Sequence, residues 1–221
     1  MPRRRRYQIG GHVYHVLNRA AKRARIFGTA SDYQTFEKVL EETVLLHQPS
    51  VAIYAYCLMP NHWHLVASPT VPGALSVFMH RLTTTHARLW HHARGSVGEG
   101  AVYQGRFSAI PIQCDRHFLI VCRYVERNAL RASLVTRAED WPWCSLWRRT
   151  YEPSPWLADW PVDRSSTWIR EVNTHQTPLE LEALRRATRR GHPFGDTQWQ
   201  AEVWPERSPI TTSVAATPDP K

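Results

Sequence analysis

The chain has 221 residues, 43% of them hydrophobic, and its 28 Lys and Arg outnumber 19 Asp and Glu, which gives a net charge of +9. That hydrophobic share allows a packed core, so the composition excludes a chain that is disordered throughout. The excess of positive charge favours a polyanionic partner, either nucleic acid or a membrane surface.

Cysteine use and the amino terminus indicate the compartment. The four cysteines form no C-x-x-C pair, so we expect free thiols in a reducing environment. Residues 3–6 are all arginine, which would suit a signal peptide, but glycines and histidines between residues 10 and 15 interrupt the apolar run that must follow. The longest apolar stretch, residues 51–59, is too short to span a bilayer. We therefore expect a cytoplasmic protein with no membrane partner.

Strands and helices alternate along the first part of the chain. Ser31 or Asp32 is expected to cap the first helix, Gly73 to start the second and Asp115 to cap the third. This order fits an α+β fold in which helices lie on one face of an antiparallel sheet, in a ferredoxin-like arrangement. In chain order the sequence predicts a strand (12–17), a helix (31–47), two strands joined as a hairpin (51–59 and 62–67), a helix (73–94), a strand (108–113) and a helix (115–130).

The amino-acid composition changes from about residue 139. Tryptophans there alternate with Pro and Arg, and residues 178–190 predict a helix with a basic end. The final residues are mostly Pro, Thr, Ser and Ala, a composition typical of disorder. We therefore expect a first domain at residues 1–150, a Trp/Arg-rich extension with the basic helix at residues 151–207, and a disordered tail at residues 208–221.

His62 and His64 are separated by one residue on a predicted strand. Side chains alternate between the two faces of a strand, so these imidazoles point the same way, roughly 6.6–6.8 Å apart along it, and can converge on one metal ion. Chance alone gives about 0.65 such pairs among the 12 histidines of the chain. The alternative is a pair of polar side chains on a solvent-facing strand, and the spacing does not decide between the two.

Tyr124 and Asn128 stand four residues apart on the third predicted helix. Positions i and i+4 share one helix face, so a phenol lies beside an amide oxygen. A phenol with a pKa near 10 is only about 0.1% ionised at pH 7, and it needs a metal or a base to act as a nucleophile. Two imidazoles and an amide oxygen would leave a divalent ion with open positions for phosphate oxygens. The alternative is a tyrosine packed on the core with its hydroxyl at the rim.

Arginines mix with Tyr, Trp and His through much of the chain. This pattern is typical of proteins that bind phosphates and stack on exposed bases. The alternative is that any one of these arginines simply lies on a solvated surface. The cluster of arginines at the amino terminus is harder to explain in that way. The arginines that we predict to bind nucleic acid are Arg3, Arg4, Arg5, Arg6, Arg19, Arg23, Arg106, Arg123 and Arg127.

Several segments agree with one family when they are taken in order. They are Gly11-His12-Val13-Tyr14-His15-Val16 with Asn18-Arg19, Met59-Pro60-Asn61-His62-Trp63-His64-Leu65-Val66, Tyr103-Gln104-Gly105-Arg106-Phe107, Arg123-Tyr124-Val125-Glu126-Arg127-Asn128 with Arg131-Ala132, and Trp141-Pro142-Trp143-Cys144-Ser145 with Arg190-Gly191-His192-Pro193-Phe194-Gly195. Together they resemble the REP-associated tyrosine transposases, which are single-tyrosine HUH transposases of the IS200-like superfamily, over about residues 7–200.

The resemblance implies a ferredoxin-like HUH fold and a metal-dependent nuclease and strand transferase that acts on single-stranded DNA at REP-type hairpins. It implies that His62 and His64 bind the metal, that Tyr124 is the catalytic nucleophile and forms a 5′-phosphotyrosine link, and that Asn128 is a third ligand or an orienting side chain. Mg²⁺ or Mn²⁺ is the expected cofactor, and Zn²⁺ also suits histidine. We expect a monomer.

Two positions depart from the family pattern. Ala129 stands where the family usually has Pro, so the third helix can run on past Asn128, and this leaves the placement of Asn128 open. Ala20 stands where Gly is common, in the basic loop after the first strand.

Two other functions stay open at this point. The same fold could bind structured DNA or RNA without cleaving it, and that binding would be indifferent to EDTA and to Tyr124→Phe. A zinc hydrolase of small phosphoesters would instead hold zinc tightly and turn over without a covalent DNA adduct. The basic surface and the pairing of Tyr124 with Asn128 argue against the hydrolase.

Overall fold

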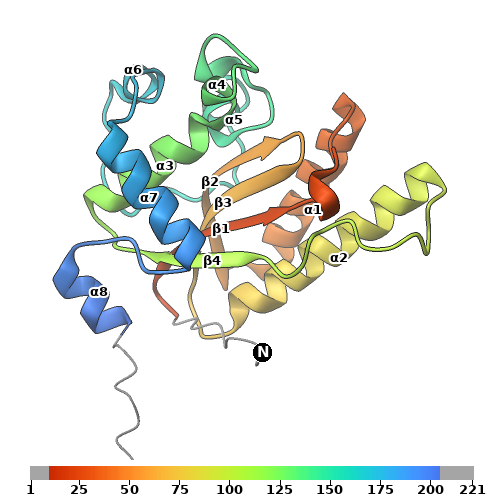
Figure 1. Ribbon diagram of the computed structural model, residues 1–221, viewed down its shortest axis with the longest axis horizontal. Helices are drawn as coiled ribbons and strands as arrows, with labels where there is room; N and C mark the ends of the chain where they lie inside the picture. Colours follow the sequence, from red (N-terminus) through yellow and green to blue (C-terminus); the bar gives the residue numbers. More distant parts are fainter. Residues whose placement is uncertain (1–9, 205–221) are drawn as a thin grey trace, which may run out of the picture.

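A four-stranded antiparallel sheet lies at the centre of the computed structural model, which describes residues 10–204 (Figure 1). Its strands are β1 Val13–Arg19, β2 Val51–Met59, β3 His62–Pro69 and β4 Ser108–Ile112, and they lie in the order β2-β3-β1-β4. β2 and β3 form the predicted hairpin, and β1 lies between β3 and β4, which is the ferredoxin-like order. The predictions made for Arg3 to Arg6 and for the tail 208–221 fall outside the described residues.

Helix boundaries follow capping residues, with one correction to the sequence prediction. Thr29, rather than Ser31 or Asp32, caps α1: its side chain accepts a bond from the Asp32 amide, and the Asp32 carboxylate accepts one from the Thr29 amide. Gly73 and Asp115 lie at the starts of α2 and α3, as expected. The α-helices of the described residues are α1 Ala30–His47, α2 Ala74–Arg94, α3 Arg116–Glu126, α4 Asn128–Arg131, α5 Ser145–Tyr151, α6 Trp168–Asn173, α7 Pro178–Arg190 and α8 Thr197–Val203.

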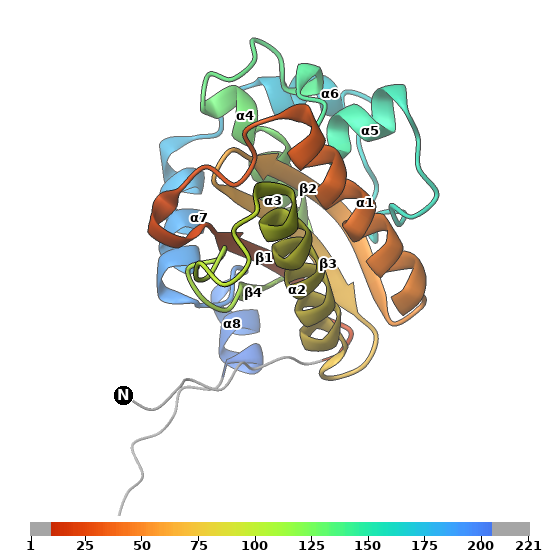
Figure 2. The same cartoon turned by 90° about the vertical axis from the view of Figure 1, so that its right-hand side faces the viewer.

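One face of the sheet is covered by α1 and α2, as a ferredoxin-like fold requires. Phe36 and Leu40 of α1 and Phe78 of α2 are buried in one hydrophobic cluster with Trp63 and Leu65 of β3. Figure 2 shows the two helices side by side over this face. Full burial of side chains of this size stabilises a fold by about 1.5–3 kcal/mol each.

The opposite face of the sheet is covered as well, which corrects the prediction that helices lie on one face only. Phe118, Val121 and Val125 of α3 are buried with Val66 of β3 and Ile110 of β4. The three α3 side chains stand at i, i+3 and i+7, so they form one apolar stripe along the helix. Because both faces of the sheet carry apolar residues, both must be shielded from water, and α3 with the extension shields the second (Figure 1).

A β-bulge in β2 decides which of its side chains face α3. The pairing of β2 with β3 shifts between Ile53 and Ala55, which leaves Tyr54 as the extra residue. Strict alternation would place Ile53, Ala55 and Cys57 on one face, but Ile53 packs in the cluster of α1 and α2, while Ala55 and Cys57 pack in that of α3. The bulge therefore turns Cys57, which pairs with His64, toward α3.

The extension packs against the sheet and α3 through tryptophans. Trp160 Nε1 donates to the Tyr54 carbonyl at 2.9 Å, and Trp168 Nε1 donates to a carboxyl oxygen of Glu126, the last residue of α3, at 2.7 Å. These tryptophans belong to the same hydrophobic cluster as α3. None of the helices in residues 10–204 is long and apolar enough to cross a membrane.

Candidate active site

His62 and His64 begin β3, and their imidazoles lie on the face of the sheet that α3 covers. They pair with Met59 and Cys57 of β2, while Trp63 between them is buried on the other face. The centroids of the two imidazole rings are 5.0 Å apart, and the ring planes are at 86°. The two rings are thus close enough to bind a common ion.

Burial keeps both imidazoles uncharged at neutral pH. It lowers the pKa of His62 to about 4, and the nearby guanidinium groups of Arg19 and Arg131 act in the same direction. Complete burial likewise holds the pKa of His64 well below its usual value. Since only an uncharged imidazole has a lone pair for a metal, both histidines are in the form that can act as a ligand.

The Nδ1 atoms of both histidines are engaged, which leaves Nε2 as the nitrogen that could bind a metal. His62 Nδ1 lies 2.6 Å from Asn61 Oδ1, to which it can donate. His64 Nδ1 lies 2.9 Å from His15 Nε2, and the two rings are stacked with centroids 5.0 Å apart. Metal-binding histidines usually have their second nitrogen held in this way. A metal on His64 Nε2 requires the proton on Nδ1, so His64 would then donate to His15.

His15 is a site residue that sequence reasoning did not identify as functional. It pairs with Val66, two residues beyond His64 on β3, so the register of the sheet puts both histidines on one face. The His15 side chain is fully buried, burial lowers its pKa to about 3, and its Nδ1 has no hydrogen-bond partner among the described residues. The sequence signal was a third histidine on a neighbouring strand, and it becomes readable only once the register is known.

Tyr124 brings its ring to the histidines from α3. Its centroid is 5.8 Å from that of His64 and 6.0 Å from that of His15, and the ring is nearly perpendicular to both. The guanidinium carbon of Arg131 lies 4.2 Å from the centroid of the same ring, in a cation–π contact. The side chains predicted as nucleophile and as metal ligands therefore form one cluster, although they come from different elements.

Asn128 lies one helical turn beyond Tyr124, and its amide oxygen is already hydrogen-bonded. The helix predicted to run to residue 130 is broken between α3 and α4 at Arg127, whose ψ is −3°, and it then winds on past Ala129, where no proline stops it. Asn128 Oδ1 accepts a bond from Arg131 at 2.5 Å. Its Nδ2 is buried and has no partner within residues 10–204.

The imidazole pair fits a divalent metal, whereas the third ligand does not fit in this arrangement. His62 and His64 offer two uncharged nitrogens, but the Asn128 oxygen is turned to Arg131. In the described part of the chain, no group of three or more His, Cys, Asp or Glu side chains is placed to hold a metal ion. His15 does not add a ligand there because its Nε2 is directed at His64. Two protein ligands would leave open positions, as in a catalytic rather than a structural site.

Three of the arginines predicted to bind DNA are exposed near the His62 end of the sheet. Arg19 pairs with His62 across β1 and β3. Arg23 lies in the short 3₁₀ helix η1 Ala21–Arg23 that follows β1. The Gln104 amide donates to the Arg19 carbonyl at 2.9 Å, which ties the loop of Arg106 to the same end. All three side chains are exposed, so they can reach a phosphate backbone.

Arg123 and Arg127 form hydrogen bonds with the extension. Their guanidinium groups donate to backbone carbonyls of residues 172–175 at 2.7–2.9 Å, and Arg127 is buried. These carbonyls occupy donors that we had predicted for DNA. In this structure both guanidinium groups anchor the extension, and the DNA contacts of these two residues stay a prediction.

A family model matches this chain, and a solved structure has the same fold. A family model described as "Transposase IS200 like" matches residues 8–128. A solved structure of a REP-associated tyrosine transposase bound to a REP hairpin has 22% sequence identity and a TM-score of 0.56, and covers 75% of this chain and 96% of its own, which shows the same fold. A putative transposase from Deinococcus radiodurans has 14% identity and a TM-score of 0.40 over 60% of this chain and 95% of its own. No curated protein gives a significant match.

Proposed function

The chain belongs to the IS200-like transposase family, and we propose that it cuts and rejoins single-stranded DNA at REP-type hairpins through a covalent bond to Tyr124. The observation that carries the proposal is the packing of the Tyr124 ring against His64, 5.8 Å from centroid to centroid. A phenol beside two uncharged imidazoles combines a nucleophile with a place for a cation, and phosphoryl transfer depends on such positioning and charge stabilisation.

In the proposed first step, the Tyr124 oxygen attacks the scissile phosphorus, and the bond between phosphorus and the 3′ oxygen breaks. The phenol proton is lost to solvent, and the departing 3′ oxygen takes up a proton to become a hydroxyl. In the second step a 3′ hydroxyl attacks the same phosphorus, the bond to Tyr124 breaks and the phenol regains a proton. One phosphodiester replaces another at each step, so rejoining needs no nucleotide cofactor.

His62 and His64 are the proposed ligands of a divalent metal, Mg²⁺ or Mn²⁺, with Zn²⁺ as the alternative. Bound there, such an ion would offset the negative charge of the scissile phosphate and help the phenol to ionise. Asn61 and His15 hold the two rings through Nδ1, so the ligands need little reorganisation. Asn128 could join as a third ligand if Arg131 shared or released its oxygen.

The proposed substrate is a REP-type hairpin with a single-stranded flank. The similar solved structure is that of a transposase bound to a REP hairpin. In this chain Arg19, Arg23 and Arg106 form an exposed basic edge beside His62, which is where phosphates of a strand entering the site would lie. We propose these three arginines as DNA contacts.

A hairpin oligonucleotide with Mg²⁺ or Mn²⁺ tests the proposal. The wild-type protein should form a protein–DNA adduct that survives denaturation, and a chelator should abolish it. Tyr124→Phe should bind the hairpin but form no adduct, whereas Tyr151→Phe, at an exposed tyrosine of α5, should form it normally. A wild-type protein that binds the hairpin but forms no adduct with any of the metals, Zn²⁺ included, would refute the proposal.

A second function, binding of structured DNA or RNA without cleavage, is favoured by one observation. Arg131 donates to the oxygen of Asn128, and this bond competes with the use of that oxygen as a third metal ligand. Under this function, hairpin affinity would be indifferent both to EDTA and to Tyr124→Phe. The adduct assay therefore separates the two functions directly.

A further inference from the structure

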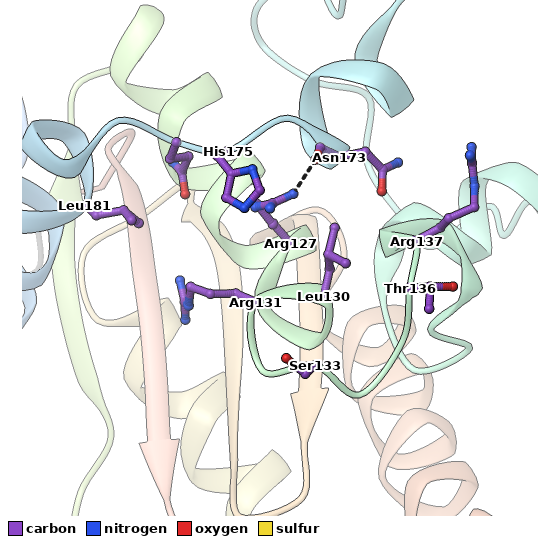
Figure 3. Close-up of a pocket in the computed structure, with 10 residues that line it drawn as sticks. Arg127, Leu130, Arg131, Ser133, Thr136, Arg137, Asn173, His175 and Leu181 are labelled. Atoms are coloured by element: carbon purple, nitrogen blue, oxygen red, sulfur yellow. Dashed lines mark hydrogen bonds between the residues drawn. The ribbon is translucent and has the colours of Figure 1, made fainter.

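A cavity of about 470 Å³ opens between α4 and the segment that joins α6 to α7 (Figure 3). Arg127, Arg131 and Arg137 line it, together with Ser133 and with His175 and Gln176 of the extension, and none of the residues that line it is acidic. A cavity with this charge attracts an anion. Its walls come both from the helix that follows Tyr124 and from the extension.

Among the arginines of this cavity, Arg131 has a buried donor without a partner in the described residues. Arg127 donates to carbonyls of the extension, and Arg137 forms an ion pair with Glu139. Arg131 uses one nitrogen on the Asn128 amide, but its other terminal nitrogen is buried and has no partner within the described residues. A buried charged donor without an acceptor is costly, so an anion that reached this nitrogen would be stabilised there.

The position of Arg131 links this cavity to the nucleophile. Its guanidinium carbon lies 4.2 Å from the centroid of the Tyr124 ring, so a group bound to its free nitrogen lies beside that ring. Phosphate is the anion that an arginine donor recognises best in a DNA-processing protein. We propose that this cavity binds a backbone phosphate of single-stranded DNA next to the scissile one, an inference that rests on the proposed function.

The extension therefore takes part in holding the substrate. His175, from the segment between α6 and α7, lies across the cavity from Arg131 (Figure 3), and Gln176 of the same segment also lines the cavity. Arg127 fixes the neighbouring carbonyls of residues 172 and 173, so this wall is held at a set distance from α4. The strand would leave the scissile phosphate through the junction between the catalytic helix and the extension.

A scan with methylphosphonates tests the proposal, because each one replaces a charged phosphate by a neutral group. Binding is measured by fluorescence anisotropy in EDTA with the Tyr124→Phe protein, which retains the ring under Arg131 and cannot cleave. One or two positions beside the scissile phosphate should weaken binding about tenfold. In the Tyr124→Phe/Arg131→Gln protein, neutralising the same positions should have no further effect, and the salt slope should fall by about 0.7.

A second pair of variants leaves Arg131 in place. Ser133 lies at the rim of the cavity, is exposed and has a φ of 56°, which Asp and Asn both tolerate. Ser133→Asp should weaken binding several-fold at low salt, whereas the neutral Ser133→Asn should leave it within about twofold. Circular dichroism checks that all variants fold.

The inference would be overturned if each methylphosphonate weakened binding equally in the Tyr124→Phe and Tyr124→Phe/Arg131→Gln proteins. A Ser133→Asp protein that binds like Ser133→Asn would also overturn it. Displacement by millimolar inorganic phosphate, without any position-specific effect on DNA, would show a site for free phosphate and would also contradict it. Because these measurements need neither metal nor cleavage, their outcome is independent of whether the covalent adduct forms.

Discussion

The rings of Tyr124 and His64 lie 5.8 Å apart, centroid to centroid, with their planes at 87°. One comes from α3 and the other from β3, and they meet because α3 packs on the face of the sheet to which His64 points. His15 from β1 completes the contact at 6.0 Å from the same phenol ring. The site therefore depends on α3, which covers the face of the sheet opposite to α1 and α2 and brings Tyr124 to the histidines.

Replacing His15 by Phe should weaken metal binding without removing a ligand. With a metal on His64 Nε2, His15 would accept from His64 Nδ1 and so hold the tautomer that the metal needs, and loss of such a partner typically costs about 10–100-fold in metal affinity. Mn²⁺ binding followed by electron paramagnetic resonance measures this directly, without turnover. His80→Phe, at an exposed position of α2, is the control. Unchanged Mn²⁺ affinity in His15→Phe would show that the pair of histidines is merely a packing feature.

Arg127→Gln should destabilise the protein by about 2–4 kcal/mol. The guanidinium group donates to two carbonyls of the extension, and each buried acceptor left unsatisfied costs about 1–3 kcal/mol. The free energy of unfolding in urea measures the loss. Arg116→Gln, at an exposed position at the start of α3, should change stability by less than about 0.5 kcal/mol. A stable Arg127→Gln protein that fails only in DNA binding would confirm the original prediction for this residue.

Stability should fall as the pH drops from about 7 to 5, and His86 should account for part of the fall. Burial lowers the pKa of His86 to about 4, and its Nδ1 lies 2.8 Å from the Tyr103 hydroxyl. Below pH 6.5 His86 is protonated in the unfolded chain but stays uncharged in the folded chain, so the free energy of unfolding falls on acidification.

The variant His86→Gln isolates this contribution. Its free energy of unfolding should fall by about 2 kcal/mol less than that of the wild type between pH 7 and pH 5. The reason is that the variant lacks the histidine that is protonated only in the unfolded chain. The exposed His92 of the same helix provides the control, and His92→Gln should keep the wild-type slope. Identical slopes in the wild type and His86→Gln would contradict the assignment of an uncharged His86.

Local patterns predicted the elements well because their causes are local. Alternation along β3 placed His62 and His64 on one face, and the glycine at residue 73 and the aspartate at residue 115 marked helix starts that the structure confirms. The cap of α1 was misplaced because Asp32 suits an N-cap as well as the N3 position of a capping box, and only the geometry of Thr29 distinguishes the two.

The assembly of the site could not be read from the sequence because it depends on register and layering. The bulge at Tyr54 reverses the alternation in β2, and no residue type announces it. The partnership of His15 with His64 follows from the pairing of β1 with β3. The carbonyls that accept from Arg127 lie 45 and 46 residues farther along the chain. The sequence around Arg127 therefore does not show that its guanidinium group is buried against the extension.

Identification of the residue that carries the DNA tests the central claim most directly. After incubation with a cleavable hairpin and Mn²⁺, the protein is digested with trypsin and nuclease, and the nucleotide-bearing peptide is sequenced by mass spectrometry. The account predicts a nucleotide 5′-phosphate on Tyr124, in the peptide of residues 124–127 that trypsin releases by cutting after Arg123 and after Arg127. A nucleotide on any other residue, or cleaved DNA with no covalent peptide at all, would contradict it.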